Sequence, residues 1–512
     1  MSASQTRAVR VALALLGALF VVNAAPRYGR FSGDAVIHLS ISERAAAGGW
    51  FEFNPGEVAS GSTSFAWTLL ESTLIRLGGM GLLLWVIPLV LLAALLGSGA
   101  LVRHLARAAG ASPLTATLAG VTFIAIPAVT YNALLGMENI VHTCAVLGAL
   151  ALWVAPVTVT RDVALGAVIG LAAMLRPEGV LLGALPLLDA RTPGGVPRLL
   201  RVAFAALVVF APSVIVHATV TGHLVPGSGV SRLMAVRRES LSLHLAGPVW
   251  IYLTALSRFV VYLPITLLAL LGARATPDEA LPRRVRRGAL TLFALGLALY
   301  TVGTGAAHVG RLTQWLFALL CTLLGLGIDA TLRAPSPSRR LALVALTALH
   351  ALLCAGETFA RMRDISQRHG GWDRAEVLSH VARRADATTR ALSLFCADGC
   401  CRPGITPTVA MVEAQLRFDY DARIRIASLD GRTASARGPG ALRFDANACP
   451  VLEPALTAPE VVAVMEPPLA QLPRCGASSP TARALTTSWG GTPSVPGWRW
   501  QPSLPGWTRL CD

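Results

Sequence analysis

Long apolar segments recur along the first 358 residues, and no other feature of the sequence restricts the possible folds as much. About 20 residues of helix cross the ~30 Å hydrocarbon core of a membrane. Only 14% of the 512 residues are charged, whereas soluble domains carry about 25%. We therefore predict a polytopic α-helical membrane protein with about eleven spans. The predicted spans are residues 11–25, 67–100, 113–130, 139–157, 162–175, 179–189, 200–220, 247–271, 288–306, 312–330 and 341–358.

The first segment follows Arg7 and Arg10, as a cleaved signal peptide would. We favour a retained anchor helix, because the rest of the chain is itself a multi-span protein.

Basic residues, all of them arginine, give the chain a net charge of +16. In a soluble protein such an excess would suggest nucleic acid, but here the arginines lie in short connections between apolar spans. This distribution marks the cytoplasmic side of a membrane protein and excludes a nucleic-acid partner. The arginines of this side are Arg103, Arg107, Arg161, Arg191, Arg198, Arg201, those from Arg274 to Arg287, Arg333, Arg339 and Arg340. The N-terminus is expected on the same side.

The opposite, extracytoplasmic side is expected to collect Asp34 and the connections 131–138, 176–178, 221–238 and 308–311. Four arginines depart from the charge bias, and they are candidates for binding an anionic group: Arg237, Arg238, Arg361 and Arg363. An odd number of spans places the C-terminal tail on this side as well.

The tail, 359–512, is polar and rich in proline and glycine, and we predict a small mixed α/β extracytoplasmic domain after a membrane domain of residues 1–358. Six cysteines follow the last span, which favours disulfides over a metal site because no histidine interleaves with them. They are Cys396, Cys400, Cys401, Cys449, Cys475 and Cys511. Cys144, Cys321 and Cys354 lie inside apolar spans and are expected to be packing residues.

The stretch 30–70 overlaps the first outer loop, 27–66, and contains a predicted amphipathic helix on the membrane surface. Ile37, Ile41 and Ala45 recur at helical spacing, Ser40 lies on the other side, and the pair 48–49 of glycines ends the helix. Asp34 begins it. A carboxylate there is either a helix cap, which contributes about 1 kcal/mol to stability, or a general base.

Four motifs in this order resemble one branch of the GT-C glycosyltransferases, which includes the mycobacterial terminal arabinofuranosyltransferase. The first is the loop from Gly33-Asp34-Ala35-Val36-Ile37 to Trp67-Thr68-Leu69-Leu70. The others are Leu135-Gly136-Met137-Glu138, Leu175-Arg176-Pro177-Glu178-Gly179 and Gly222-His223-Leu224-Val225-Pro226-Gly227. Together they cover most of the first 240 residues.

The resemblance implies an enzyme that takes a sugar from a polyprenyl-phosphate donor in the membrane lipid and passes it to a glycan or lipid acceptor of the cell envelope. It implies inversion at the anomeric carbon, with Asp34 as the general base, in the bacterial inner membrane. This chain departs from the family pattern at Gly33, where a second acid is frequent, and at Ser40, where a basic residue is frequent.

The remaining site residues are expected on the outer face. Arg311, Arg237 and Arg176 are candidates for the donor phosphate, since guanidinium groups bind phosphate and stabilise a leaving anion. Each also has a plain interpretation, as a headgroup contact or, for Arg176, as a structural ion pair with Glu178. Substrate-pocket candidates are Glu138, Glu178, His223, His308 and Asn54. No metal site or other cofactor is indicated, although a divalent cation is compatible with Glu138.

Two other functions fit the same features. A transporter or flippase of a lipid-linked sugar would also need many spans, but it would tend to show internal repeats and polar motifs at both faces. A catalytically inactive family member would explain the departures at Gly33 and Ser40.

Overall fold

The computed structural model describes residues 3–31, 34–52, 58, 62, 64–222, 262–303, 313–333 and 336–366, together with four strands of the tail. The chain divides into two compact units. The first comprises Met1–Gly29, Ile87–Pro212 and Ser240–Gly370, and the second comprises Arg30–Val86, Ser213–Glu239 and Gly371–Asp512. The domain boundary that we predicted at residue 358 stays a prediction.

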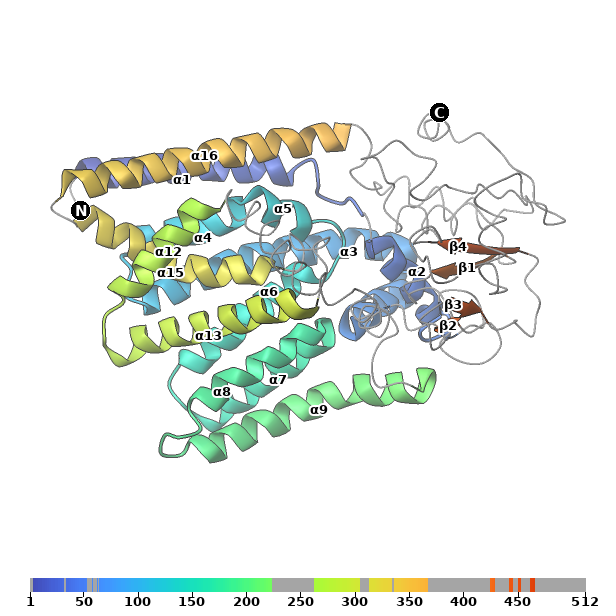
Figure 1. Cartoon of the computed structure of the whole chain (residues 1–512). Coiled ribbons are helices and arrows are strands. Elements are labelled where there is room, and N and C mark those ends of the chain that lie inside the picture. Colours follow the sequence, from blue (N-terminus) through green and yellow to red (C-terminus); the bar gives the residue numbers. More distant parts are fainter. Residues whose placement is uncertain are drawn as a thin grey trace. The chain divides into compact units, whose positions relative to one another are not determined.

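The described part of the first unit is entirely helical (Figure 1). Helix α3 begins in the second unit and α9 ends there. The helices are α1 (Ala3–Ala24), α3 (Phe65–Ala108), α4 (Pro113–Ala125), α5 (Pro127–Ala133), α6 (Asn139–Val154), α7 (Val159–Leu175), the 3-10 helix η1 (Pro177–Gly183), α8 (Ala184–Leu188), α9 (Gly195–Thr221), α12 (Leu263–Ala275), α13 (Ala280–Gly303), α15 (Gln314–Arg333) and α16 (Pro337–Ser366).

Five described helices are long and apolar enough to cross a membrane, and a bent pair makes up to six. Helix α6 has 16 residues and α7 has 17, about 24–26 Å at 1.5 Å per residue. These two are therefore shorter than the ~30 Å hydrocarbon core. The chain is a polytopic helical membrane protein, and the count of eleven spans stays a prediction.

Proline and glycine break three of the predicted spans. The segment 113–130 is not one span but α4 and α5, which meet at a 60° bend, because Pro127 cannot continue the helix of α4. The segment 179–189 is η1 followed by the short α8. Helix α3 is interrupted at Gly78 and Gly79, whose φ values are −154° and 70°.

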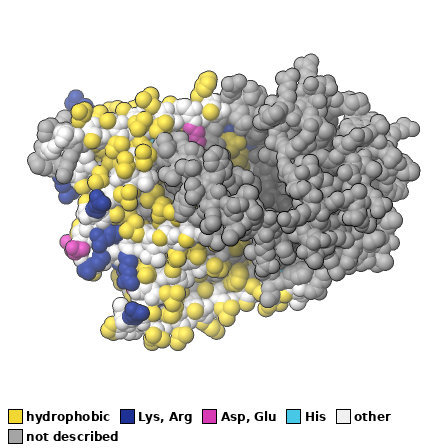
Figure 2. Space-filling view, in the orientation of Figure 1, with side chains coloured by type: hydrophobic (Ala, Val, Ile, Leu, Met, Phe, Trp, Pro, Cys, Tyr) yellow, Lys and Arg dark blue, Asp and Glu magenta, His cyan; other side chains and the backbone are white. Residues whose placement is uncertain are grey.

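The arginines predicted to share one side do lie together at one end of the first unit (Figure 2). Arg284 pairs there with Asp189, which joins α13 to the turn before α9. Asp329 near the end of α15 accepts hydrogen bonds from Ser112 at the start of α4, at 2.6 and 3.0 Å. The exposed arginines of this end are Arg103, Arg107, Arg161, Arg191, Arg274, Arg283, Arg287 and Arg333. We call it the arginine end.

The described helix of the first outer loop is α2 (Asp34–Ala46), in the second unit. Its end is as predicted: Gly48 has a φ of +102°, and the Gly49 amide donates to the Arg44 carbonyl at 2.9 Å, a left-handed C-cap. Its polar side was predicted wrongly. Ser40 is 1% exposed, so α2 is enclosed on more than its apolar side.

Four short strands are described in the tail. Strand β1 (Ile424–Ser428) pairs in parallel with β4 (Val461–Met465), and β2 (Leu442–Phe444) pairs antiparallel with β3 (Pro450–Leu452). The mixed α/β domain as a whole stays a prediction.

Candidate functional site

Arg176 and Glu178 from one predicted motif and Glu138 from another form one buried ion cluster. The Arg176 guanidinium donates to Glu138 Oε1 at 2.7 Å and to Glu178 Oε1 at 3.1 Å. The same guanidinium donates to Asn139 Oδ1 at 2.6 Å. The side chains of Arg176 and Glu138 are only 10% and 1% exposed. The Arg176 guanidinium therefore contacts two carboxylates at once.

The local sequence explains why these side chains meet. A residue before proline avoids helical backbone, so Arg176 is extended, with φ −153° and ψ 137°, and ends α7. Gly179 then packs against that helix, because an added Cβ would lie 2.3 Å from the Ala172 backbone. The motif 135–138 turns at Gly136, whose φ is 85°, and places Glu138 at the start of α6.

Two aromatic residues that we did not predict extend this cluster. Trp315 Nε1 donates to the Tyr300 hydroxyl at 2.8 Å, and that hydroxyl donates to Glu178 Oε1 at 3.3 Å. The His142 ring meets the Trp315 ring edge-on, with 6.4 Å between ring centroids. We call Glu138, Asn139, His142, Arg176, Glu178, Tyr300 and Trp315 the Arg176 cluster.

The Arg176 cluster and the arginine end lie at opposite ends of the same helices. Helix α6 runs from Asn139 in the cluster to Trp153, which hydrogen-bonds Asp189 at the arginine end at 2.9 Å. Helix α7 runs from Asp162 at the arginine end to Arg176. Within the first unit the two motif turns 131–138 and 176–178 therefore lie opposite the arginine end, as predicted. The assignment of that end to the cytoplasm stays a prediction.

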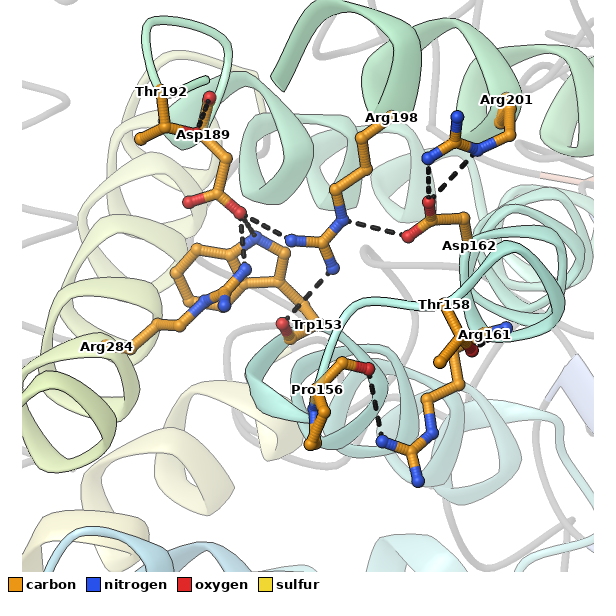
Figure 3. Close-up of polar contacts among 10 residues, drawn as sticks. All are labelled: Trp153, Pro156, Thr158, Arg161, Asp162, Asp189, Thr192, Arg198, Arg201 and Arg284. Atoms are coloured by element: carbon orange, nitrogen blue, oxygen red, sulfur yellow. Dashed lines mark hydrogen bonds and ion pairs between the residues drawn. The ribbon is translucent and has the colours of Figure 1, made fainter. Parts of the chain in front are cut away.

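A second polar network holds the arginine end together (Figure 3). Asp162, which is 0% exposed, accepts from Arg198 Nε at 2.9 Å and from Arg201 Nη2 at 2.7 Å. Asp189 accepts from Arg198 Nη1 at 2.7 Å and from Arg284. These contacts join α7, α9, the turn before α9, and α13. The charge-bias argument placed these arginines on one side but did not reveal their aspartate partners.

Asp34, the predicted base, is the first residue of α2 in the second unit. One turn later, His38 Nδ1 lies 3.3 Å from Ser62 Oγ, which also contacts Thr68 Oγ1 at 2.9 Å. On the next turn, Ser42 donates to Glu71 Oε2 at 2.7 Å. These contacts fix α2, of which Asp34 is the first residue, against the start of α3.

The other predicted site residues, Arg311, Arg237, His223, His308 and Asn54, lie outside the described residues, as do the six cysteines of the tail. Cys144, Cys321 and Cys354 are free thiols. In the described ranges, no three His, Cys, Asp or Glu side chains are grouped as a metal site would need. The divalent cation stays a prediction.

Sequence reasoning also missed Arg27, which is 1% exposed and stacks on the Tyr131 ring at 3.8 Å from its centroid. The one available signal was an arginine placed just after the first apolar segment, away from the arginine end.

The structure was compared with known proteins. No protein-family model matches the chain, and no curated protein matches it. The solved structure of ArnT from Cupriavidus metallidurans bound to undecaprenyl phosphate is similar over 82% of this chain and 86% of that one, with a TM-score of 0.54 and 14% identity. The apo structure of the same protein gives a TM-score of 0.51 at 14% identity, over 84% of this chain and 88% of that one.

The chain has the fold of ArnT. Membership of the GT-C superfamily, which the sequence motifs suggest, stays a prediction, because the similarity at 14% identity is one of fold. The finer resemblance to the arabinofuranosyltransferase branch is not confirmed by these likenesses.

Proposed function

We propose that this chain is a glycosyltransferase of the GT-C type that moves a sugar from a polyprenyl-phosphate donor to an acceptor of the cell envelope. The observation that carries the proposal is the fold shared with ArnT, whose solved structure holds undecaprenyl phosphate. The four ordered sequence motifs and the buried Arg176 cluster opposite the arginine end support it. The arabinofuranosyltransferase-like branch is the part of the proposal that rests on the motifs alone.

The reaction is a single inverting displacement. The acceptor hydroxyl oxygen attacks the anomeric carbon while the bond from that carbon to the phosphate oxygen breaks, and polyprenyl phosphate leaves with the electron pair. Asp34 takes the proton of the hydroxyl as general base.

We assign the donor phosphate to Arg311 and Arg237. Arg176 is less suited to direct phosphate contact, because two carboxylates already balance its charge. Its place in the proposal is the wall of the substrate pocket, together with Glu138 and Glu178. Three further residues complete that pocket: His223, His308 and Asn54.

The proposed topology has eleven spans in the bacterial inner membrane, with the arginine end and the N-terminus in the cytoplasm. The tail then forms a disulfide-bonded extracytoplasmic domain that helps to orient the acceptor. Transfer would take place at the outer face of the membrane.

Asp34→Asn tests the base. In a deletion strain complemented with this variant, we expect loss of one envelope sugar residue and accumulation of its polyprenyl-phosphate donor, both measured by mass spectrometry, at a normal protein level. Glu43→Gln on the same helix is the matched control and should restore transfer. Transfer retained by Asp34→Asn would return Asp34 to the role of a helix cap. A deletion strain without donor accumulation would refute the transferase itself.

A further inference from the structure

Three buried side chains near Trp315 carry polar atoms that no described residue hydrogen-bonds. They are Asn139 Nδ2, both ring nitrogens of His142, and Gln314 Oε1. The three residues are 3%, 1% and 1% exposed. Buried polar atoms are nearly always hydrogen-bonded, because an unmet one costs free energy of folding. Partners from outside the chain are therefore expected at these atoms.

The three residues belong to one neighbourhood. Asn139 and His142 are three residues apart on α6 and so share a helix face. Arg176 donates to the side-chain oxygen Oδ1 of Asn139 at 2.6 Å. The side-chain nitrogen Nδ2 of Asn139 is therefore the atom that lacks a partner among the described residues. His142 meets the Trp315 ring, and Gln314 directly precedes Trp315 at the start of α15.

The chemistry of the unmet atoms selects the kind of partner. An amide nitrogen only donates and an amide oxygen only accepts, whereas a neutral imidazole has one donor and one acceptor nitrogen. A phosphate needs donors and a metal ion needs acceptors, so neither matches this even mixture. A hydroxyl group both donates and accepts.

We propose that Asn139, His142 and Gln314 form a subsite that binds the hydroxyl groups of the sugar carried by the lipid donor. This inference rests on the proposed function and deepens it. The subsite recognises the sugar, while the donor phosphate is bound by other groups. Ordered water in the same place would satisfy the same atoms, and the experiment separates the two.

The test measures binding to the full-length protein in nanodiscs. The probes are undecaprenyl phosphate and the same lipid phosphate carrying glucose, galactose, mannose or arabinose. We expect the wild-type protein to bind at least one sugar-bearing lipid about tenfold more tightly than the bare lipid phosphate. His142→Leu should reduce this ratio to about one, and His142→Gln, which restores an amide donor and acceptor, should recover part of it.

Thr143→Val is the matched control, since Thr143 is buried on the same helix and its hydroxyl donates to the backbone carbonyl of Asn139 at 3.0 Å. It should keep the wild-type ratio. If His142→Leu also keeps the ratio, or weakens both lipids equally, the subsite holds only water or serves packing, and the inference is overturned. A wild-type protein that binds the bare lipid phosphate as tightly as every sugar-bearing one overturns the subsite alone. One that binds neither overturns the proposed function with it.

Discussion

Replacement of Arg176 by methionine tests whether the buried ion cluster is held together by its one cation. The change keeps the side chain long and apolar but removes the guanidinium. Glu138, whose side chain is 1% exposed, and Glu178, at 11%, then both lose the guanidinium that they contact. The side-chain oxygen of Asn139 also loses the hydrogen bond of 2.6 Å that Arg176 donates to it.

The expected loss is large because the carboxylates cannot return to water without opening the turn. Removing one partner of a buried ion pair costs about 3–5 kcal/mol, since it leaves an uncompensated charge. Arg176→Met combined with Glu138→Gln and Glu178→Gln should recover most of that loss, because neutral amides remove the unpaired charges. Replacing a whole buried ionic group is often close to neutral.

The measurement is the free energy of unfolding in mixed micelles, with Arg161→Met as the control. Arg161 is exposed, and its guanidinium donates to the Pro156 carbonyl at 3.1 Å, so its removal should change stability by about 0.5 kcal/mol or less. An Arg176→Met loss within about 1 kcal/mol of the control, or a triple variant no more stable than Arg176→Met, would contradict the assignment of a buried ion cluster.

Other changes test the arginine end and the packing of the Arg176 cluster. Asp162→Asn should cost about 3–5 kcal/mol of unfolding free energy in the same assay, because the buried Arg198 and the partly exposed Arg201 both lose their carboxylate partner. Asp278→Asn should cost under about 1 kcal/mol, because the Asp278 side chain is 90% exposed and its partner lies 3.8 Å away. Equal effects would refute the buried network. Gly296→Ala should destabilise by about 1–3 kcal/mol, because its Cβ would lie 2.2 Å from the Trp315 ring. Gly148→Ala, with no atom within 4 Å of its Cβ, should stabilise by about 0.4–1 kcal/mol. Thermal unfolding followed by circular dichroism measures the stability of both variants. If both changes in stability had the same sign, Trp315 would not pack as described.

The helices were largely predictable from local signals. A few adjacent residues are enough to recognise each of these signals. They are the apolar segments of membrane length, the arginines between them and the glycine pair after α2. The errors fell where two signals compete. Hydropathy favoured one span over 113–130, but Pro127 ends the helix there, and helical spacing placed Ser40 outside although it is buried.

The candidate site was predictable only in part. Arg176, Glu138 and Glu178 stood out because charges at membrane depth are costly and are kept for a reason. Tyr300, Trp315 and His142 did not stand out, because aromatic and histidine residues on apolar helices are most often packing residues. Their role depends on neighbours 100 or more residues away along the chain, as with the 122-residue separation between Tyr300 and Glu178.

The sequence by itself determined that this chain lies in a membrane and which of its connections share a side. It also determined which motifs carry charge within the membrane. Each of these properties is set by the transfer of local segments between water and lipid. Only the tertiary structure decided that Glu138, Arg176 and Glu178 form one ion cluster, that Asp162 and Asp189 hold the arginine end, and that His142 is buried with unmet nitrogens. Such pairings depend on how α6, α7, α13 and α15 pack, and packing is a property of several helices at once.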